Sequence, residues 1–304
     1  MLGDWINKVV KPLANQDDFI KLVRANDNGE KWASQKINKM FQEGVPDLIP
    51  RIAKARVQIY KNAAYKGDLR AQYYYGLSLQ GIDNEESLRF LLPLAENGNV
   101  DAIIAIAMGY GHYGGYGEDE AKNFKWYMRA AEMGDAHAMN QVALKYVSER
   151  DYDKAFYWYK ELANQNNAKG FCGMAKCYEN RITILNHNNR KQNTKEIQTL
   201  YQEAEKLYNL AIQNVNNIHD EESAYWGLGG LYHSWSYTIQ QNNIKTNMLK
   251  KAIYYYMVSY DCGNDYGLKN AKDIAVRNKI VVNILFLREL LFSIIPLNKS
   301  YEMF

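Results

Sequence analysis

A repeated pattern of small and apolar residues constrains this chain more than any other feature of its sequence. Each unit begins with a small residue, followed four positions later by an apolar residue and five positions later by a second small residue. The first small position is held by Ala71, Ala102, Ala138, Gly170 and Ala224, and the second by Gly76, Ala107, Ala143, Ala175 and Gly229. Subtracting the first-position numbers gives spacings of 31, 36, 32 and 54 residues. A period of this length, built from helices, predicts an α-solenoid.

A second pattern, an aromatic residue followed by small residues and a glycine, marks the other helix of each unit. In the stretch from 119 to 146 it is formed by Trp126-Tyr127, Ala130-Ala131 and Gly134. Two helices approach closely only where small residues lie at their crossing, and a large ring then fills the space between neighbouring hairpins. We therefore expect a helix from Asp119 to about Met133, a turn at Gly134-Asp135 and a second helix from Ala136.

The units resemble Sel1-like repeats, which are relatives of tetratricopeptide repeats. The resemblance is carried by Asp119, Lys122, Trp126-Tyr127, Ala130-Ala131 and Gly134, and again by Asp151, Lys154-Ala155, Trp158-Tyr159 and Ala163. It covers the chain from about Arg56 to Gly267 and weakens after Tyr178. The resemblance implies an all-α fold, an α/α superhelical solenoid of helix-turn-helix repeats with helical caps.

The sequence divides into a repeat array and two caps. Residues 1–45 are interpreted as an N-terminal helical cap, residues 46–275 as the array, and residues 276–304 as a C-terminal capping helix. A cap is expected at each end because a terminal repeat otherwise exposes a face that neighbours cover elsewhere. For the apolar part of the last segment, Ile280 to Ile295, a partner-binding or membrane-surface role is the alternative. Residues 181–195 carry four cations and no acid, and are interpreted as a basic surface loop inserted in the array, with a partner contact as the alternative.

The composition argues against several classes of protein. With 37 Lys and Arg against 34 Asp and Glu, the net charge of +3 is too small to favour nucleic acid as the main partner. Three cysteines do not make a secreted disulfide framework, and the first residues lack the apolar core of a secretory signal. The apolar run from 280 to 296 contains Arg288 and Glu289 and is shorter than the roughly 20 residues of a membrane span. We therefore expect a cytoplasmic protein with no transmembrane segment.

The sequence offers no convincing catalytic, metal or cofactor site. Residues Gly109 to Gly114 match GxGxxG, but the preceding residues belong to a helical repeat rather than to the strand that a dinucleotide site requires. Cys172 and Cys177 point to different sides of a predicted helix, which favours packing over zinc binding. The histidines, which lack metal-ligand spacing, are His112, His137, His187, His219 and His233.

The remaining candidates are surface positions on the first helix of each unit. First helices line the inner face of a helical array, so residues between the core positions are expected to face a concave groove. The predicted partner-binding residues are Tyr73, Tyr74, Asn140, Gln141, Lys145, Lys176, Trp226 and His233. Aromatic residues beside amides and cations are common in protein interfaces. For Tyr73 and Trp226, packing against a neighbouring helix is the alternative.

These observations predict a non-enzymatic protein–protein interaction module that binds a protein partner in the groove. The resemblance implies bacterial roles in complex assembly, signalling or host interaction. The narrower hypothesis is an immunity protein that neutralises a toxic effector acting in the cytoplasm. One alternative is a scaffold or adaptor for a signalling or membrane-associated complex. An alternative of another class is a hydrolase whose site lies between residues 181–220 and the C-terminal cap.

Overall fold

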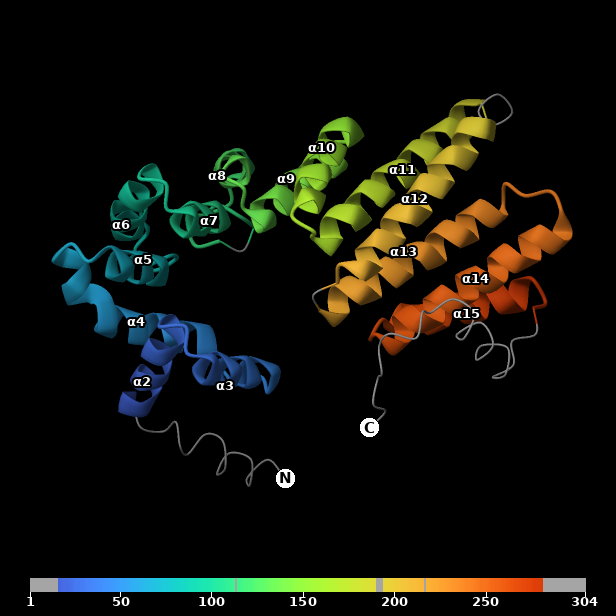
Figure 1. The fold of residues 1–304 in the computed structure, drawn as a ribbon. Coiled ribbons are helices and arrows are strands. Elements are labelled where there is room, and N and C mark those ends of the chain that lie inside the picture. The colour runs from blue at the N-terminus through green and yellow to red at the C-terminus, as the bar shows by residue number, and fades with distance from the viewer. Residues whose placement is uncertain (1–15, 113, 190–193, 216, 281–304) are drawn as a thin grey trace, which may run out of the picture. The chain divides into compact units, whose positions relative to one another are not determined.

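The computed structural model describes residues 16–112, 114–189, 194–215 and 217–280, which form helices joined by short connections and contain no strand (Figure 1). The chain divides into two compact units, with the boundary after Ala138. The first unit contains α2 (Gln16–Asp27), α3 (Lys31–Gln42), α4 (Leu48–Tyr65), α5 (Leu69–Ser78), α6 (Asn84–Glu96), α7 (Val100–Gly109) and α8 (Glu120–Glu132). Helix α9 (Ala136–Ser148) crosses the boundary. The second unit continues with α10 (Tyr152–Asn164), α11 (Ala168–Asn189), α12 (Thr194–Gln213), α13 (Ile218–Ser236), α14 (Asn242–Asp261) and α15 (Asp265–Arg277).

An Asp or Asn side chain starts the first helix of successive units. It lies three residues before the first small position and accepts a hydrogen bond from that residue's backbone N–H, which otherwise has no partner at a helix start. The pairs are Asp68–Ala71 at 2.7 Å, Asn99–Ala102 at 2.8 Å and Asp135–Ala138 at 2.7 Å. The second helices use the same device, with the pairs Asp83–Glu86, Asp119–Lys122 and Asp151–Lys154. A repeated capping position therefore accompanies the repeated small residue.

The turn at Gly134 confirms the helix-turn-helix predicted for residues 119–146. Gly134 has φ +93°, a left-handed conformation that glycine adopts without a steric penalty. Its N–H donates to the Ala131 carbonyl at 2.9 Å, and the N–H of Asp135 donates to the Ala130 carbonyl at 3.1 Å. These bonds satisfy the last carbonyls of α8. Asp135 then caps α9 at once, so a very short turn joins the two helices.

The small residues of the repeat are buried where neighbouring helices cross. Every residue of the first and second small columns is buried, and the apolar residue between them is buried in four of the five units. The aromatic rings lie between helices. In the second unit a row of stacked rings joins Tyr201, Trp235, Tyr232 and Tyr255, with centroid separations of 5.1, 6.1 and 5.6 Å. The close helix packing predicted from the small and aromatic residues is therefore confirmed in the part of the chain that the structure describes.

The prediction of a surface loop at residues 181–195 is wrong for most of that range. Helix α11 continues to Asn189, and α12 begins at Thr194, so the long spacing of 54 residues arises largely from two lengthened helices (Figure 1). Residues 190–193 lie outside the described part. Ile182 is buried against α12, and Arg181 forms an ion pair with Glu196 at 2.9 Å. These contacts stabilise the helix despite its Asn-rich, basic composition.

The two caps are only partly described. Helices α2 and α3 lie within the predicted N-terminal cap and share an apolar core with α4, built around Phe19, Leu22, Val23, Ile37 and Met40. The predicted C-terminal capping helix from 280 to 295 lies outside the described residues beyond Ile280. The last described helix is α15.

Adjacent glycines in α13 allow the close-crossing argument to be tested. A Cβ at Gly229 would lie 2.7 Å from the buried ring of Tyr256, whereas a Cβ at Gly230 would meet only the Tyr256 hydroxyl at 3.6 Å. We expect Gly229→Ala to be less stable than Gly230→Ala by about 1–3 kcal/mol, the usual cost of overpacking a core. Gly230→Ala should equal or exceed the parent in stability, because alanine favours helices by about 1 kcal/mol over glycine. Urea unfolding of both variants measures this difference, and equal stabilities would contradict the close crossing.

Candidate partner-binding surface

The predicted partner-binding residues are divided between the two units. Tyr73 and Tyr74 lie on α5 in the first unit. The other six lie in the second unit, with Asn140, Gln141 and Lys145 on α9, Lys176 on α11, and Trp226 and His233 on α13. Lys176 is exposed, and all the others are half-buried. Their role in binding a partner stays a prediction.

Tyr73 and Tyr74 both contact their own chain. The Tyr74 ring stacks on Tyr60 of α4 at 5.1 Å, and its hydroxyl donates to the backbone carbonyl of Asp27 at 3.0 Å. Tyr73 packs edge-on against Tyr74, with ring centroids 5.1 Å apart. Burial, followed by the negative charge of Asp101, raises the pKa of Tyr73 to about 12. Both rings therefore stabilise the packing of α5, whether or not they also reach a partner.

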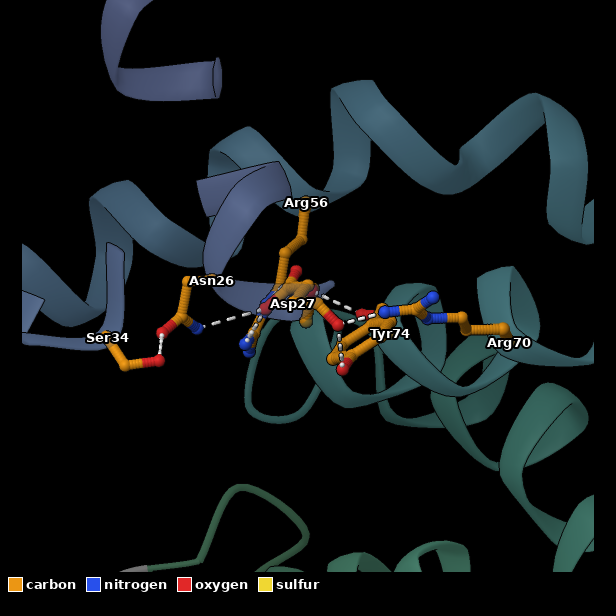
Figure 2. Close-up of polar contacts among 7 residues, drawn as sticks. Asn26, Asp27, Ser34, Arg56, Arg70 and Tyr74 are labelled. Atoms are coloured by element: carbon orange, nitrogen blue, oxygen red, sulfur yellow. Dashed lines mark hydrogen bonds and ion pairs between the residues drawn. The ribbon is translucent and has the colours of Figure 1, made fainter. Parts of the chain in front are cut away.

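Figure 2 shows the polar cluster around Asp27 that holds these helices. The Asp27 side chain is fully buried, and its carboxylate accepts from Arg56 Nη2 at 2.6 Å and from Nε at 2.9 Å. The Asp27 carbonyl also accepts from Arg70 and Tyr74 of α5. One residue at the end of α2 thus connects α2 to both α4 and α5. The sequence shows Asp27 only as part of a turn, and nothing in its spacing from Arg56 indicates the pairing.

The predicted polar residues of the second unit differ in their contacts. Lys145 forms an ion pair with Glu149 at 3.2 Å, one turn further along α9. Lys176 forms an ion pair with Glu179 of α11 at 2.9 Å, and the side chain of Glu179 is largely buried. Pairs of this i,i+3 or i,i+4 kind hold a side chain only loosely, so both ammonium groups can be redirected to a partner at low cost.

Trp226 and His233 are anchored within the second unit. Trp226 packs edge-on against Tyr256 of α14, with centroids 4.9 Å apart, as the packing alternative predicted. His233 Nε2 lies 3.0 Å from the Tyr237 hydroxyl, within hydrogen-bond distance. Burial, followed by the positive charge of Arg277, lowers the pKa of His233. The imidazole is therefore biased towards its neutral form.

A pocket of about 350 Å³ lies between α11, α12 and the C-terminal end of α13. Its lining residues are Glu179, Ile182, Thr183, Asn186, His187, Tyr201, Ser234, Tyr237 and Thr238. Two predicted residues contact this lining, since Lys176 pairs with Glu179 and His233 is hydrogen-bonded to Tyr237. The composition of residues 181–195 predicts a loop, and a loop there does not predict this pocket. The spacing of Ile182 and Leu185, which continues the apolar face of α11 past Tyr178, is the sequence signal for a longer helix.

The motifs rejected on sequence grounds have structural roles. The Gly109–Gly114 segment follows the C-terminal end of α7 and has no strand before it. A Cβ at Gly109 would lie 2.4 Å from the Tyr116 ring, whose hydroxyl contacts Ser87 at 2.7 Å and accepts from Gln80 at 3.1 Å. The glycine therefore makes room for a ring that contacts the neighbouring repeat.

The cysteines Cys172 and Cys177 lie within the packed helices of the second unit. Burial raises the pKa of Cys172 and of Cys177 to about 12, so both thiols stay protonated and are poor nucleophiles at neutral pH. Within the described ranges, no group of three or more His, Cys, Asp or Glu is placed to hold a metal ion. Among the same residues, no helix combines the length and apolar character required to cross a membrane.

Comparisons with known proteins identify the fold. No family model matches the chain. The chain is 24% identical over 278 residues to the chitin synthase regulator SKT5 of Saccharomyces cerevisiae, covering 82% of this chain and 37% of the yeast protein. Among solved structures, it superposes with a TM-score of 0.53 and 17% identity on c5321, a protective antigen of uropathogenic Escherichia coli strains with an SLR fold, covering 95% of this chain and 62% of that one. A Sel1 repeat protein from Oxalobacter formigenes gives a TM-score of 0.50 and 17% identity, with 85% of this chain and 97% of that one covered.

The chain therefore has the fold of Sel1 repeat proteins. This confirms the resemblance found in the sequence and the predicted all-α superhelical repeat architecture. The chain spans less than two thirds of the length of the yeast regulator and of the bacterial antigen.

The buried pair in the first unit gives a prediction about stability. Replacing Arg56 with Ala leaves the Asp27 carboxylate buried without its partner, which typically costs about 3–5 kcal/mol. Arg89→Ala is the matched control, because Arg89 is 67% exposed and faces Glu86 at 3.6 Å across one helical turn. We expect a large fall in the urea midpoint of the first unit for Arg56→Ala and little change for Arg89→Ala. Similar effects of the two changes would contradict the role assigned to Asp27.

The environment of His233 predicts a pH dependence. The unfolded chain binds a proton at His233 near the usual pKa of 6.5, whereas the folded chain binds it only at lower pH. This contribution to stability is therefore present above pH 6.5 and is lost as the pH falls below that value. We expect His233→Gln to make thermal stability fall less steeply between about pH 6.5 and 5. Asn164→Gln, at an exposed residue that carries no titratable group, is the control and should leave the slope unchanged.

Proposed function

We propose that this chain is a protein-binding module that acts by holding a partner rather than by catalysis. The observation that carries the proposal is the Sel1 repeat fold itself, in which closely packed helix pairs present fixed side chains to a partner. Such a surface loses little conformational freedom on binding, so contacts made there convert efficiently into affinity. The first helices provide aromatic, amide and basic groups of the types enriched in interfaces.

The proposed binding role has two main versions, which differ in the kind of protein that is bound. The first is a regulatory or scaffolding role, in which the bound protein is an enzyme or a component of a larger complex. The similarity to a yeast regulator of chitin synthase supports this version. The second is the immunity role predicted from the sequence, in which the partner is a toxic effector acting in the cytoplasm. Both versions use the same surface, and we favour the first because the yeast relative is itself a regulator.

Substitutions on the first helices should weaken partner binding. The partner is identified by affinity capture with the full chain, purified, and titrated by calorimetry against variants. We expect the pair Asn140→Ala with Gln141→Ala, and separately Lys176→Glu, each to weaken binding about fivefold or more, because interface hot spots are worth over 1 kcal/mol. Lys160→Glu is the control, an exposed lysine of α10 outside the predicted set. Equal affinities for all of these variants would contradict the predicted surface.

The same partner distinguishes the two versions of the function. Expressed alone, an effector should arrest growth, and co-expression of this chain should restore it. A regulated enzyme should instead change its activity in proportion to the amount of this chain that is bound. A partner that shows neither behaviour, and assembles with no third protein, would exclude both versions. Screening the purified chain against hydrolase substrates, with point changes in residues 181–220, tests the alternative of another class.

A further inference from the structure

The pocket between α11, α12 and the end of α13 offers mainly hydrogen-bond acceptors. The hydroxyl protons of Thr183, Ser234 and Thr238 are already donated to the backbone carbonyls of Glu179, Leu231 and Trp235, at 3.0, 2.9 and 2.8 Å. Each hydroxyl oxygen therefore retains lone pairs but has no proton left for a ligand. A molecule that binds these three hydroxyls has to bring its own donors.

Asn186 adds an acceptor that has no hydrogen bond. Its Oδ1 is buried and accepts none from the described residues. A buried polar atom left without a partner is costly, by about 1–3 kcal/mol, so one at the wall of a pocket marks a place where a ligand donor gains most. The residue lies on α11 in the same lining as Thr183 and Glu179.

The charges and helix dipole at the pocket favour a cation. Glu179 contributes a carboxylate, whose oxygens accept from Tyr208 and Lys176, and the lining residues of the described chain include His187 but no Lys or Arg. The C-terminal end of α13, at Ser236, adds the partial negative charge of its last carbonyls. Two cations lie near the rim, Lys176 on Glu179 at 2.9 Å and Lys245 over the Tyr237 ring at 5.9 Å. Both are on flexible side chains, and neither lines the pocket.

The aromatic walls and the volume restrict the cation further. The Tyr237 ring is 60% exposed and open to a ligand, whereas Tyr201 is only 2% exposed and stacks on Trp235 with an interplanar angle of 3°. A guanidinium is planar, stacks on such rings, and carries five donors for several acceptors, whereas an ammonium carries three and is more strongly hydrated. The volume of about 350 Å³ is at the lower end of ligand pockets and suits one side chain. We propose that this pocket receives an arginine side chain of the partner protein, an inference that rests on the proposed function.

The proposal is tested with N-acetyl-arginine amide as the probe and the full chain labelled with ¹⁵N-asparagine. We expect a saturable shift of the Asn186 side-chain amide signal, with a Kd on the order of millimolar for a ligand of this size. N-acetyl-citrulline amide, which has nearly the same shape without the charge, should bind about tenfold more weakly. N-acetyl-aspartate amide should cause no shift. Equal binding of the arginine and citrulline probes, or a preference for the aspartate probe, would overturn the proposal.

Variants locate the binding. Asn186→Leu should weaken the arginine probe about fivefold or more, followed through the backbone amides of Thr183 and Thr238 in uniformly labelled chain. Asn164→Leu, at an exposed asparagine that ends α10, is the matched control and should bind like the parent. If Asn186→Leu is unstable, Ser234→Ala combined with Thr238→Val removes two acceptors without touching α11. Unchanged affinity in whichever of these variants folds would overturn the proposal.

The probe requires no partner, so this test and that of the proposed function can fail separately. Suppose that a captured partner binds the Asn186→Leu variant normally and that the arginine probe causes no shift. This result would contradict the proposed arginine pocket but not the proposed protein-binding function. A specific shift from the arginine probe, with no partner captured by the full chain, would instead remove the proposed function and with it the assignment of the arginine to a partner protein.

Discussion

The close crossing of paired helices is the constraint on which the rest of the structure depends. Helices approach to this distance only where a hydrogen or a methyl group lies at the contact, and the two small columns supply such groups in every repeat. At Gly229 the space of a single methyl is taken by the Tyr256 ring. Once the pairs are set at this distance, the gaps between pairs have a fixed size. Tyrosine and tryptophan rings fill those gaps, which explains why a chain with 25 Tyr places so many of them half-buried.

Buried polar groups fix which helices become neighbours. Asp27 connects α2 to α4 through Arg56 and to α5 through its carbonyl. In the second unit, the hydroxyl of Tyr208 on α12 donates to Glu179 of α11, and that of Tyr232 on α13 donates to Glu205 of α12. Apolar packing alone tolerates small shifts along a helix, whereas a buried carboxylate loses its partner if the register changes. These pairs therefore contribute specificity as well as stability.

Function follows from features that the repeat leaves variable. The small columns are needed for the close packing of the helices, so they recur in every unit and leave other positions free to differ. The lengthened helices α11 and α12 depart from the regular repeat, and the pocket lies where they meet the end of α13. Glu179 contributes both to the packing of the helices and to the pocket. One of its carboxylate oxygens accepts a hydrogen bond from the hydroxyl of the buried Tyr208, and the residue also lines the pocket. The pocket of the second unit thus lies where its helices depart from the regular repeat.

The sequence by itself determined the repeat, because small residues, capping residues and glycine turns act locally and recur at fixed spacing. It predicted the turn at Gly134 correctly, and it correctly placed the residues before Gly109 in a helix. Only the tertiary structure decided the pairing of Asp27 with Arg56, and whether residues 181–189 form a loop or the end of a helix. An Asn-rich, basic stretch favours a loop by composition, whereas the apolar spacing of Ile182 and Leu185 favours a helix. Burial of Ile182 in a core shared with α12, a contact that local sequence does not encode, decides between the two. Tertiary packing also created the acceptor-lined pocket, because its residues come from three helices and meet only after those helices have packed.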